Sequence, residues 1–157
     1  MLVLAMRPDR IVVGEVRGAE AFELTRAINA GCGFLCTLHA NSARDAVDAI
    51  VNAALMAGEN VTELIVRRIF VGALDLVVHV DRDDGGDERR VRRQITEITA
   101  VVPSLSEGVT YEPIFVRDSM GAPLTWTGVV PPTLEARLDR VLPPDARLRT
   151  VLERGVS

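Results

Sequence analysis

Two short apolar segments joined by a helical pattern constrain the fold of this chain more than any other feature. The segment at residues 10–16 is rich in β-branched residues, and a similar β-type segment covers residues 34–39. Between them, residues 19–30 show helical spacing, which predicts two parallel strands connected by a helix. A parallel sheet is stable when both of its faces are buried, so two strands indicate only part of a larger sheet. We therefore expect a fragment, or a chain that needs a partner.

The rest of the pattern predicts further helices and then antiparallel strands. Asn41 or Ser42 can cap a helix that continues to Leu55, and Thr62 opens another. The remaining predicted elements are a strand at 76–80, a hairpin turn at 83–87, its partner strand at 89–102, a strand at 110–117, and a helical region at 134–152 that Pro143 and Pro144 interrupt. This order predicts an α/β fold in which parallel strands with helices precede an antiparallel β extension and a C-terminal helical segment.

The charged residues exclude several chemistries. The formal net charge is −4 and the pI about 5.2, so no overall positive field favours a nucleic acid, and none is expected as a partner. All 18 basic residues are Arg, and the absence of Lys rules out a Schiff-base lysine or a Walker A lysine within these residues. The apolar segments are too short to span a bilayer and no export signal is evident, so we expect a cytoplasmic protein.

Cys32, Cys36 and His39 are too few for a structural zinc site, which needs four ligands. We expect both cysteines to be reduced and packed. His79 lies within an apolar strand without polar neighbours in sequence, so we expect it to be structural. The arginines at positions 89, 90, 92 and 93 face the aspartates at 81, 83, 84 and 87 across the predicted turn, which favours cross-strand ion pairs.

Glu15 and His39 are the candidate functional residues. Each follows one of the two predicted parallel strands, where α/β sheets bind ligands. Glu15 could polarise a water or hold Mg²⁺ through water, and the alternatives are an ion pair with Arg17 or a cap on the next helix. His39 could donate a hydrogen bond to a phosphate, or simply bond a loop carbonyl. Arg7, Arg10 and Arg17 flank the first strand and could neutralise phosphate, or be its solvated ends.

Residues 6–18 (MRPDRIVVGEVRG) and 37–42 (TLHANS) together resemble two signatures of the type II/type IV secretion ATPases. The match is closest to the branch that powers Flp/Tad pilus assembly, in which the first segment resembles the atypical Walker B motif and the second the His box. Residues 27–31, 42–46 and 54–58 continue the similarity, and it becomes looser towards Gly128 and Pro131.

This resemblance implies that Glu15 is the catalytic Walker B acid, which also binds Mg²⁺ through water, and that His39 is the His-box contact near the γ-phosphate of ATP. Arg17 and Thr37 would support nucleotide binding. Residues 1–80 would be the C-terminal part of a RecA-like P-loop NTPase core, and residues 81–157 an antiparallel β extension and helical region of the same domain. Such enzymes form hexameric cytoplasmic rings, peripheral to the inner membrane, that act on a membrane platform protein.

Family members carry an N-terminal domain, a Walker A loop and an Asp box before this region, and no counterpart precedes Met6 here. We therefore expect the C-terminal half of a secretion or pilus-assembly ATPase that does not hydrolyse ATP alone. An alternative is a non-catalytic interaction or regulatory module that joins a ring of intact ATPase subunits or binds the pilus platform. A third is a small α/β ligand-binding domain, which predicts that Glu15 and His39 do not share one edge of the sheet.

Overall fold

The computed structural model describes residues 7–83, 92–105 and 108–154. The chain forms two compact units, which we call unit 1 (Met1–Leu74) and unit 2 (Asp75–Ser157). The sequence pattern places the division at 80/81, within a strand that pairs with the second half of the chain. The structural division therefore lies before that strand rather than inside it.

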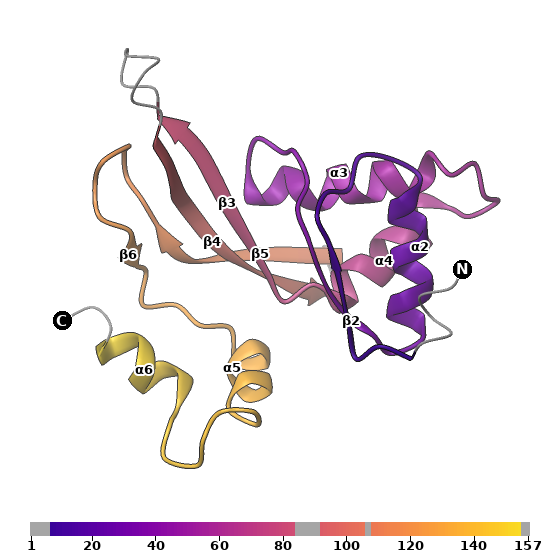
Figure 1. The fold of residues 1–157 in the computed structure, drawn as a ribbon. Helices are drawn as coiled ribbons and strands as arrows, with labels where there is room; N and C mark the ends of the chain where they lie inside the picture. The colour runs from indigo at the N-terminus through magenta and orange to yellow at the C-terminus, as the bar shows by residue number, and fades with distance from the viewer. Residues whose placement is uncertain (1–6, 84–91, 106–107, 155–157) are drawn as a thin grey trace. The chain divides into compact units, whose positions relative to one another are not determined.

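Unit 1 contains the predicted parallel pair and three helices (Figure 1). Its elements are β1 (Arg10–Val13), α2 (Glu20–Asn29), β2 (Gly33–Cys36), α3 (Ala43–Leu55) and α4 (Glu63–Ala73). β1 and β2 are parallel, with Arg10 opposite Gly33 and Val13 opposite Cys36. The predicted strand–helix–strand unit is thus confirmed, although both strands end before the predicted site residues, which lie in the loops that follow.

Local signals explain where these helices begin and end. The Ser42 hydroxyl accepts a hydrogen bond from the Asp45 amide at 3.0 Å, so Ser42 rather than Asn41 caps α3. Gly31 and Gly58 follow α2 and α3 with φ angles of 83° and 70°, a left-handed conformation that favours glycine and ends a helix. Arg67 of α4 pairs with Asp48 of α3 at 2.6 Å and joins the two helices.

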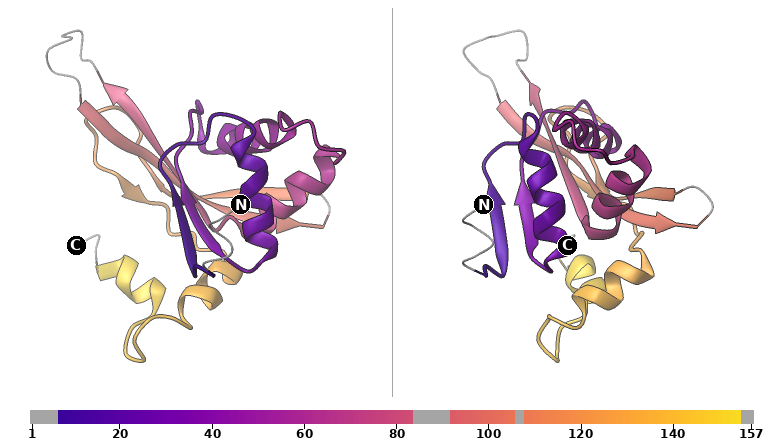
Figure 2. Two further views of the ribbon diagram at one scale, coloured as in Figure 1. Left: turned by 45° about the vertical axis from the view of Figure 1, so that its right-hand side comes forward. Right: turned by 90° about the vertical axis from the view of Figure 1, so that its right-hand side faces the viewer.

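The core of unit 1 lies on one face of the β1–β2 pair. Phe70, Ile50 and Val66 are almost fully buried, and Phe34 of β2 makes an edge-to-face ring contact with Phe70 at 6.3 Å. Figure 2 shows the helices on one side of the two strands. On the other face Val12 and Leu35 are 73% and 65% exposed. An apolar face left exposed beside a helix-covered one is what we expect of a parallel pair that is only part of a larger sheet.

Unit 2 is an antiparallel sheet in the order β3-β4-β5-β6, followed by two short helices. The elements are β3 (Leu76–Asp83), β4 (Arg92–Ser104), β5 (Gly108–Val116), β6 (Thr125–Trp126), α5 (Pro132–Leu138) and α6 (Leu148–Arg154). The hairpin, the third strand and the interrupted helical region are confirmed. The two-residue strand β6 was not predicted, since so short a segment has no measurable periodicity. The predicted turn residues from 84 onward and Arg89 and Arg90 lie outside the described residues.

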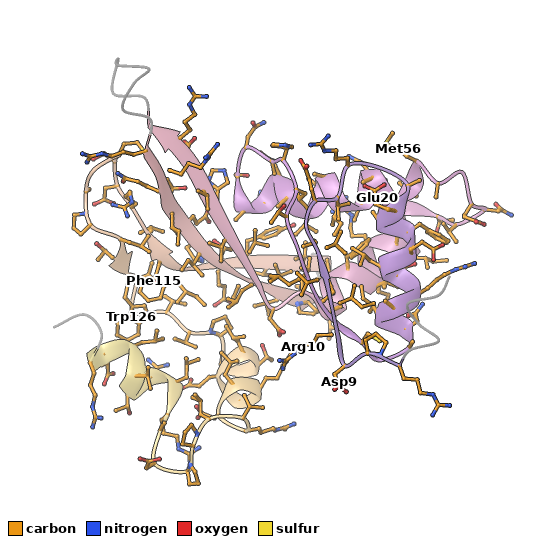
Figure 3. All side chains as sticks on the ribbon, viewed as in Figure 1. Asp9, Arg10, Glu20, Met56, Phe115 and Trp126 are labelled. Carbon is orange, nitrogen blue, oxygen red and sulfur yellow. The ribbon has the colours of Figure 1, made fainter. Side chains whose placement is uncertain are left out.

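Ala100, Ile114 and Leu134 form the centre of the unit 2 core. Phe115 and Trp126, labelled in Figure 3, are paired across β5 and β6 and pack against this core. Among the residues that the structure describes, in either unit, no helix is long and apolar enough to cross a membrane.

The register of the β3–β4 hairpin bears on two of the predictions. The strand register places Asp83 opposite Arg92, as predicted, but it also places Arg82 directly opposite Arg93, so a like-charged pair lies beside the predicted pair of opposite charges. His79 does have a polar neighbour, because its Nδ1 lies 2.8 Å from the Thr96 hydroxyl on the paired strand. That partner is seventeen residues away in sequence. A pattern along one strand does not show which polar group the paired strand supplies.

Candidate functional site

Glu15 and His39 meet at one edge of the β1–β2 pair, as predicted. Glu15 follows β1 and His39 follows β2, and His39 Nε2 lies 2.8 Å from Glu15 Oε1. Because the strands are parallel, the loops that follow them lie at the same end of the sheet. The imidazole therefore bonds the carboxylate, and the alternative of a loop carbonyl as its partner is not what the structure shows.

The second carboxylate oxygen of Glu15 is also engaged. An Arg17 guanidinium nitrogen lies 2.6 Å from Oε2, so the ion pair considered as an alternative role for Glu15 is present together with the His39 contact. The side chain of Glu15 is 29% exposed, whereas those of Arg17 and His39 are 76% and 91% exposed. The site is therefore a shielded carboxylate between two side chains that solvent, or a ligand, can reach.

The charge state of Glu15 follows from these contacts. The hydrogen bond from Arg17 is the main cause that lowers the pKa of the Glu15 carboxyl, and it outweighs the partial burial that raises it. The same bond raises the pKa of the Arg17 guanidinium. Glu15 is therefore a carboxylate at neutral pH, the form that can accept a proton from water or attract a cation.

Two hydrogen bonds connect the loops that carry these residues. The Thr37 hydroxyl donates to the Gly14 carbonyl oxygen, and the Val16 amide donates to the Thr37 carbonyl oxygen at 2.8 Å. Thr37 thus lies close to Glu15, and its hydroxyl donates its proton to the backbone of the preceding residue, Gly14. Both loops are fixed to each other on either side of Glu15.

Sequence reasoning missed Glu20. One oxygen of its carboxylate accepts hydrogen bonds from the Arg17 amide at 2.6 Å and the Gly18 amide at 3.0 Å. These backbone bonds lower the pKa of the Glu20 carboxyl. Glu20 is labelled in Figure 3 at the start of α2. The available sequence signal was an acidic residue in the first turn of a helix, which is common and does not indicate a contact with the preceding loop.

Arg10, labelled in Figure 3, begins β1 and Arg7 precedes it, whereas Glu15 follows the other end of that strand. A cavity of about 390 Å³ at the start of β1 is lined by Arg7, Pro8, Asp9, Ala30, Gly31 and Cys32. Of the three arginines proposed to neutralise phosphate beside Glu15, only Arg17 is near that residue.

The cysteines are free, as predicted. The Cys32 thiol donates to the Pro8 carbonyl oxygen at 3.1 Å, and burial raises the pKa of Cys36. Within the described ranges, no group of three or more His, Cys, Asp or Glu side chains is placed to bind a metal.

Comparison with known families gives a match over residues 2–81, about half of the chain, to the family described as Type II/IV secretion system protein. The chain belongs to this family. The matched residues include both segments from which the resemblance to secretion ATPases was inferred. Together with the shared edge of Glu15 and His39, this membership excludes an unrelated ligand-binding domain with accidental motif matches.

Curated relatives in the family have names that refer to conjugal transfer. A Mycobacterium tuberculosis protein whose name refers to conjugal transfer is 37% identical over 99 residues, which cover 62% of this chain and 26% of the relative. The conjugal transfer protein TrbB of Rhizobium radiobacter is 36% identical over 93 residues, covering 59% of this chain and 27% of TrbB. The chain thus matches about a quarter of the length of these relatives.

Among solved structures, the chain is similar to the VirB11 ATPase from the Brucella suis type IV secretion system, crystallised in complex with sulphate. The TM-score is 0.52 and the identity 29%, over 62% of this chain and 30% of the VirB11 chain. This similarity confirms the predicted α/β, RecA-like fold class.

Proposed function

We propose that this chain supplies the water-activating part of an ATP-hydrolysis site in a secretion-system ATPase. The observation that carries the proposal is the contact between the Glu15 carboxylate and His39 at the end of two parallel strands. A carboxylate is the usual general base or water-orienting group in such sites, and an imidazole can donate a hydrogen bond to a phosphate oxygen. Membership of the family and the similarity to the VirB11 ATPase support this assignment.

The residues fit the nucleotide and Mg²⁺ by their chemistry. Glu15 is ionised and partly exposed, which suits a carboxylate that binds Mg²⁺ through water, and Mg²⁺ when bound would neutralise phosphate charge. His39 and Arg17 are the exposed donors beside it, and Thr37 holds the Gly14 backbone. The 157 residues contain no Lys, so a Walker A lysine for this site would come from outside them.

Two secretion machines are candidates for the larger assembly. The motif residues resemble the Flp/Tad pilus branch, whereas the names of the curated relatives favour a conjugal transfer machine. In either case we propose that the chain acts in a ring of ATPase subunits on the cytoplasmic side of the inner membrane, against a platform protein. The alternative of a non-catalytic module within such a ring is tested below with a chimera.

Calorimetry of the purified chain with ATP and Mg²⁺ is the first test. The proposal expects no saturable heat up to millimolar nucleotide, because the chain holds only part of the site. Saturable binding that disappears in Glu15→Gln would show that the site is complete within the chain, contrary to the proposal. Binding that persists in Glu15→Gln would place the nucleotide elsewhere. The matched control is Glu59→Gln, which changes an exposed glutamate in the loop after α3.

A chimera tests the catalytic role directly. Unit 1 replaces the matching segment of the Brucella suis VirB11 ATPase, and steady-state ATP hydrolysis is measured. We expect Glu15→Gln to lower turnover by about 100-fold or more, a typical loss for a general base, while Glu59→Gln leaves it unchanged. A chimera that hydrolyses ATP equally well with Glu15→Gln would contradict the proposal. A folded chimera that binds ATP without hydrolysing it would instead favour the non-catalytic module.

A further inference from the structure

Glu20 holds a loop that carries two of the candidate site residues. We infer that Glu20 is a positioning residue, which anchors the Arg17–Gly18 backbone so that Arg17 bonds the Glu15 carboxylate. The importance of this role for catalysis rests on the proposed function. The hydrogen bonds of Glu20 with the Arg17 and Gly18 amides are independent of it.

The direction of the Glu20 hydrogen bonds distinguishes this role from ordinary helix capping. Helix caps satisfy the free amides of the first helical turn or, in a capping box, the amide of the N-cap residue. Here the N-cap is Ala19, which has no side-chain cap, and Glu20 is the first helical residue. Its carboxylate bonds the amides of Arg17 and Gly18, which precede the N-cap. The bonds therefore fix the loop relative to α2 rather than complete the helix.

The backbone bonds of Glu20 also bear on which carboxylate, that of Glu15 or that of Glu20, pairs with the Arg17 guanidinium. Glu20 attracts the Arg17 guanidinium electrostatically, but its Oε1 accepts the two amides. The guanidinium instead lies 2.6 Å from Glu15 Oε2. Arg17 therefore donates its backbone amide to Glu20 and its guanidinium to Glu15. Without the Glu20 carboxylate, the Arg17 backbone loses its anchor and the contact with Glu15 weakens.

Nuclear magnetic resonance of the full chain tests this inference without nucleotide. In Glu20→Ala we expect amide hydrogen exchange at Arg17 and Gly18 to become about tenfold faster, as one lost hydrogen bond implies. The Glu15 carboxyl ¹³C resonance should move towards its position in Arg17→Ala. Glu20→Gln keeps an acceptor oxygen, so it should restore most of both signals. The matched control is Glu23→Ala, which removes another acidic residue of the first turn of α2 whose ion pair is with Arg26.

The inference is overturned if Glu20→Ala leaves the Glu15 carboxyl resonance where it is in the unchanged chain. It is also overturned if Glu23→Ala moves that resonance equally, since the effect would then be general loosening of α2. Because no nucleotide is used, this result is independent of the ATP experiments. If the chimera does not hydrolyse nucleotide, the proposed function is contradicted, but the inference about Glu20 is unaffected.

Discussion

The two sheets of this chain differ in how far each is complete. β1 and β2 are parallel, need α2 to connect them and have helices on one face, with Val12 and Leu35 exposed on the other. The sheet of β3 to β6 is antiparallel and joins neighbouring strands directly in sequence. Antiparallel sheets tolerate a solvated face, whereas parallel sheets are usually covered on both. The candidate site lies on the parallel pair, the sheet that leaves an apolar face exposed.

The largest effect we expect comes from the unit 1 core. Phe70 is fully buried and contacts Phe34, so Phe70→Ala should lower the free energy of unfolding by about 3 to 5 kcal/mol. Hydrogen exchange measured by residue should show the loss of protection in α2, α3 and α4, while the β3–β4 hairpin keeps its protection. Equal loss of protection in both units would mean that the two units unfold together. The difference between their sheets would then not be a difference in stability.

Acid should affect unit 1 through two identified carboxyl groups. The pKa values of Glu15 and Glu20 are lowered, mainly by the Arg17 side chain and by backbone amides respectively. Their contribution to stability is therefore present above the unfolded value of about 4.3 and is lost as pH falls through the lower folded values. Thermal unfolding between pH 7 and pH 3 should show a shallower decline in Glu20→Gln. If the thermal unfolding of Glu20→Gln depends on pH as that of the unchanged chain does, Glu20 does not contribute to the loss of stability in acid.

A smaller effect is expected in unit 2, where Arg82 lies directly opposite Arg93. Replacing this like-charged pair with opposite charges in Arg93→Glu should stabilise the hairpin by about 0.5 kcal/mol. Urea unfolding at low and high salt provides the measurement, since salt should reduce the gain. Destabilisation by Arg93→Glu would indicate that Arg93 has a partner that its cross-strand position does not show.

The smallest effect tests the open face of β1. Val12 is 73% exposed, so Val12→Thr should change the free energy of unfolding by no more than about 0.5 kcal/mol. Urea unfolding is compared with the mass in solution from light scattering. A loss of more than about 1.5 kcal/mol, well above the usual range for surface positions, would show that this face is covered in solution, for example by a second copy.

The sequence predicted the parallel pair, the helix boundaries and the shared edge of Glu15 and His39, because these depend on local patterns and on the geometry of parallel strands. It failed where a partner from another element decides the outcome. The register of the hairpin placed Arg93 opposite Arg82 and supplied Thr96 to His79. Glu20 was missed for a related reason: its contacts are close in sequence, but they depend on the exact path of the loop, which no periodicity describes.

The hydrogen bonds between the two loops have a mechanical consequence. Thr37 bonds Gly14 and Val16 on either side of Glu15, and His39 lies two residues beyond Thr37. A displacement of either strand end is therefore transmitted to the backbone of the other, so the loop that carries the carboxylate and the loop that carries the imidazole move together.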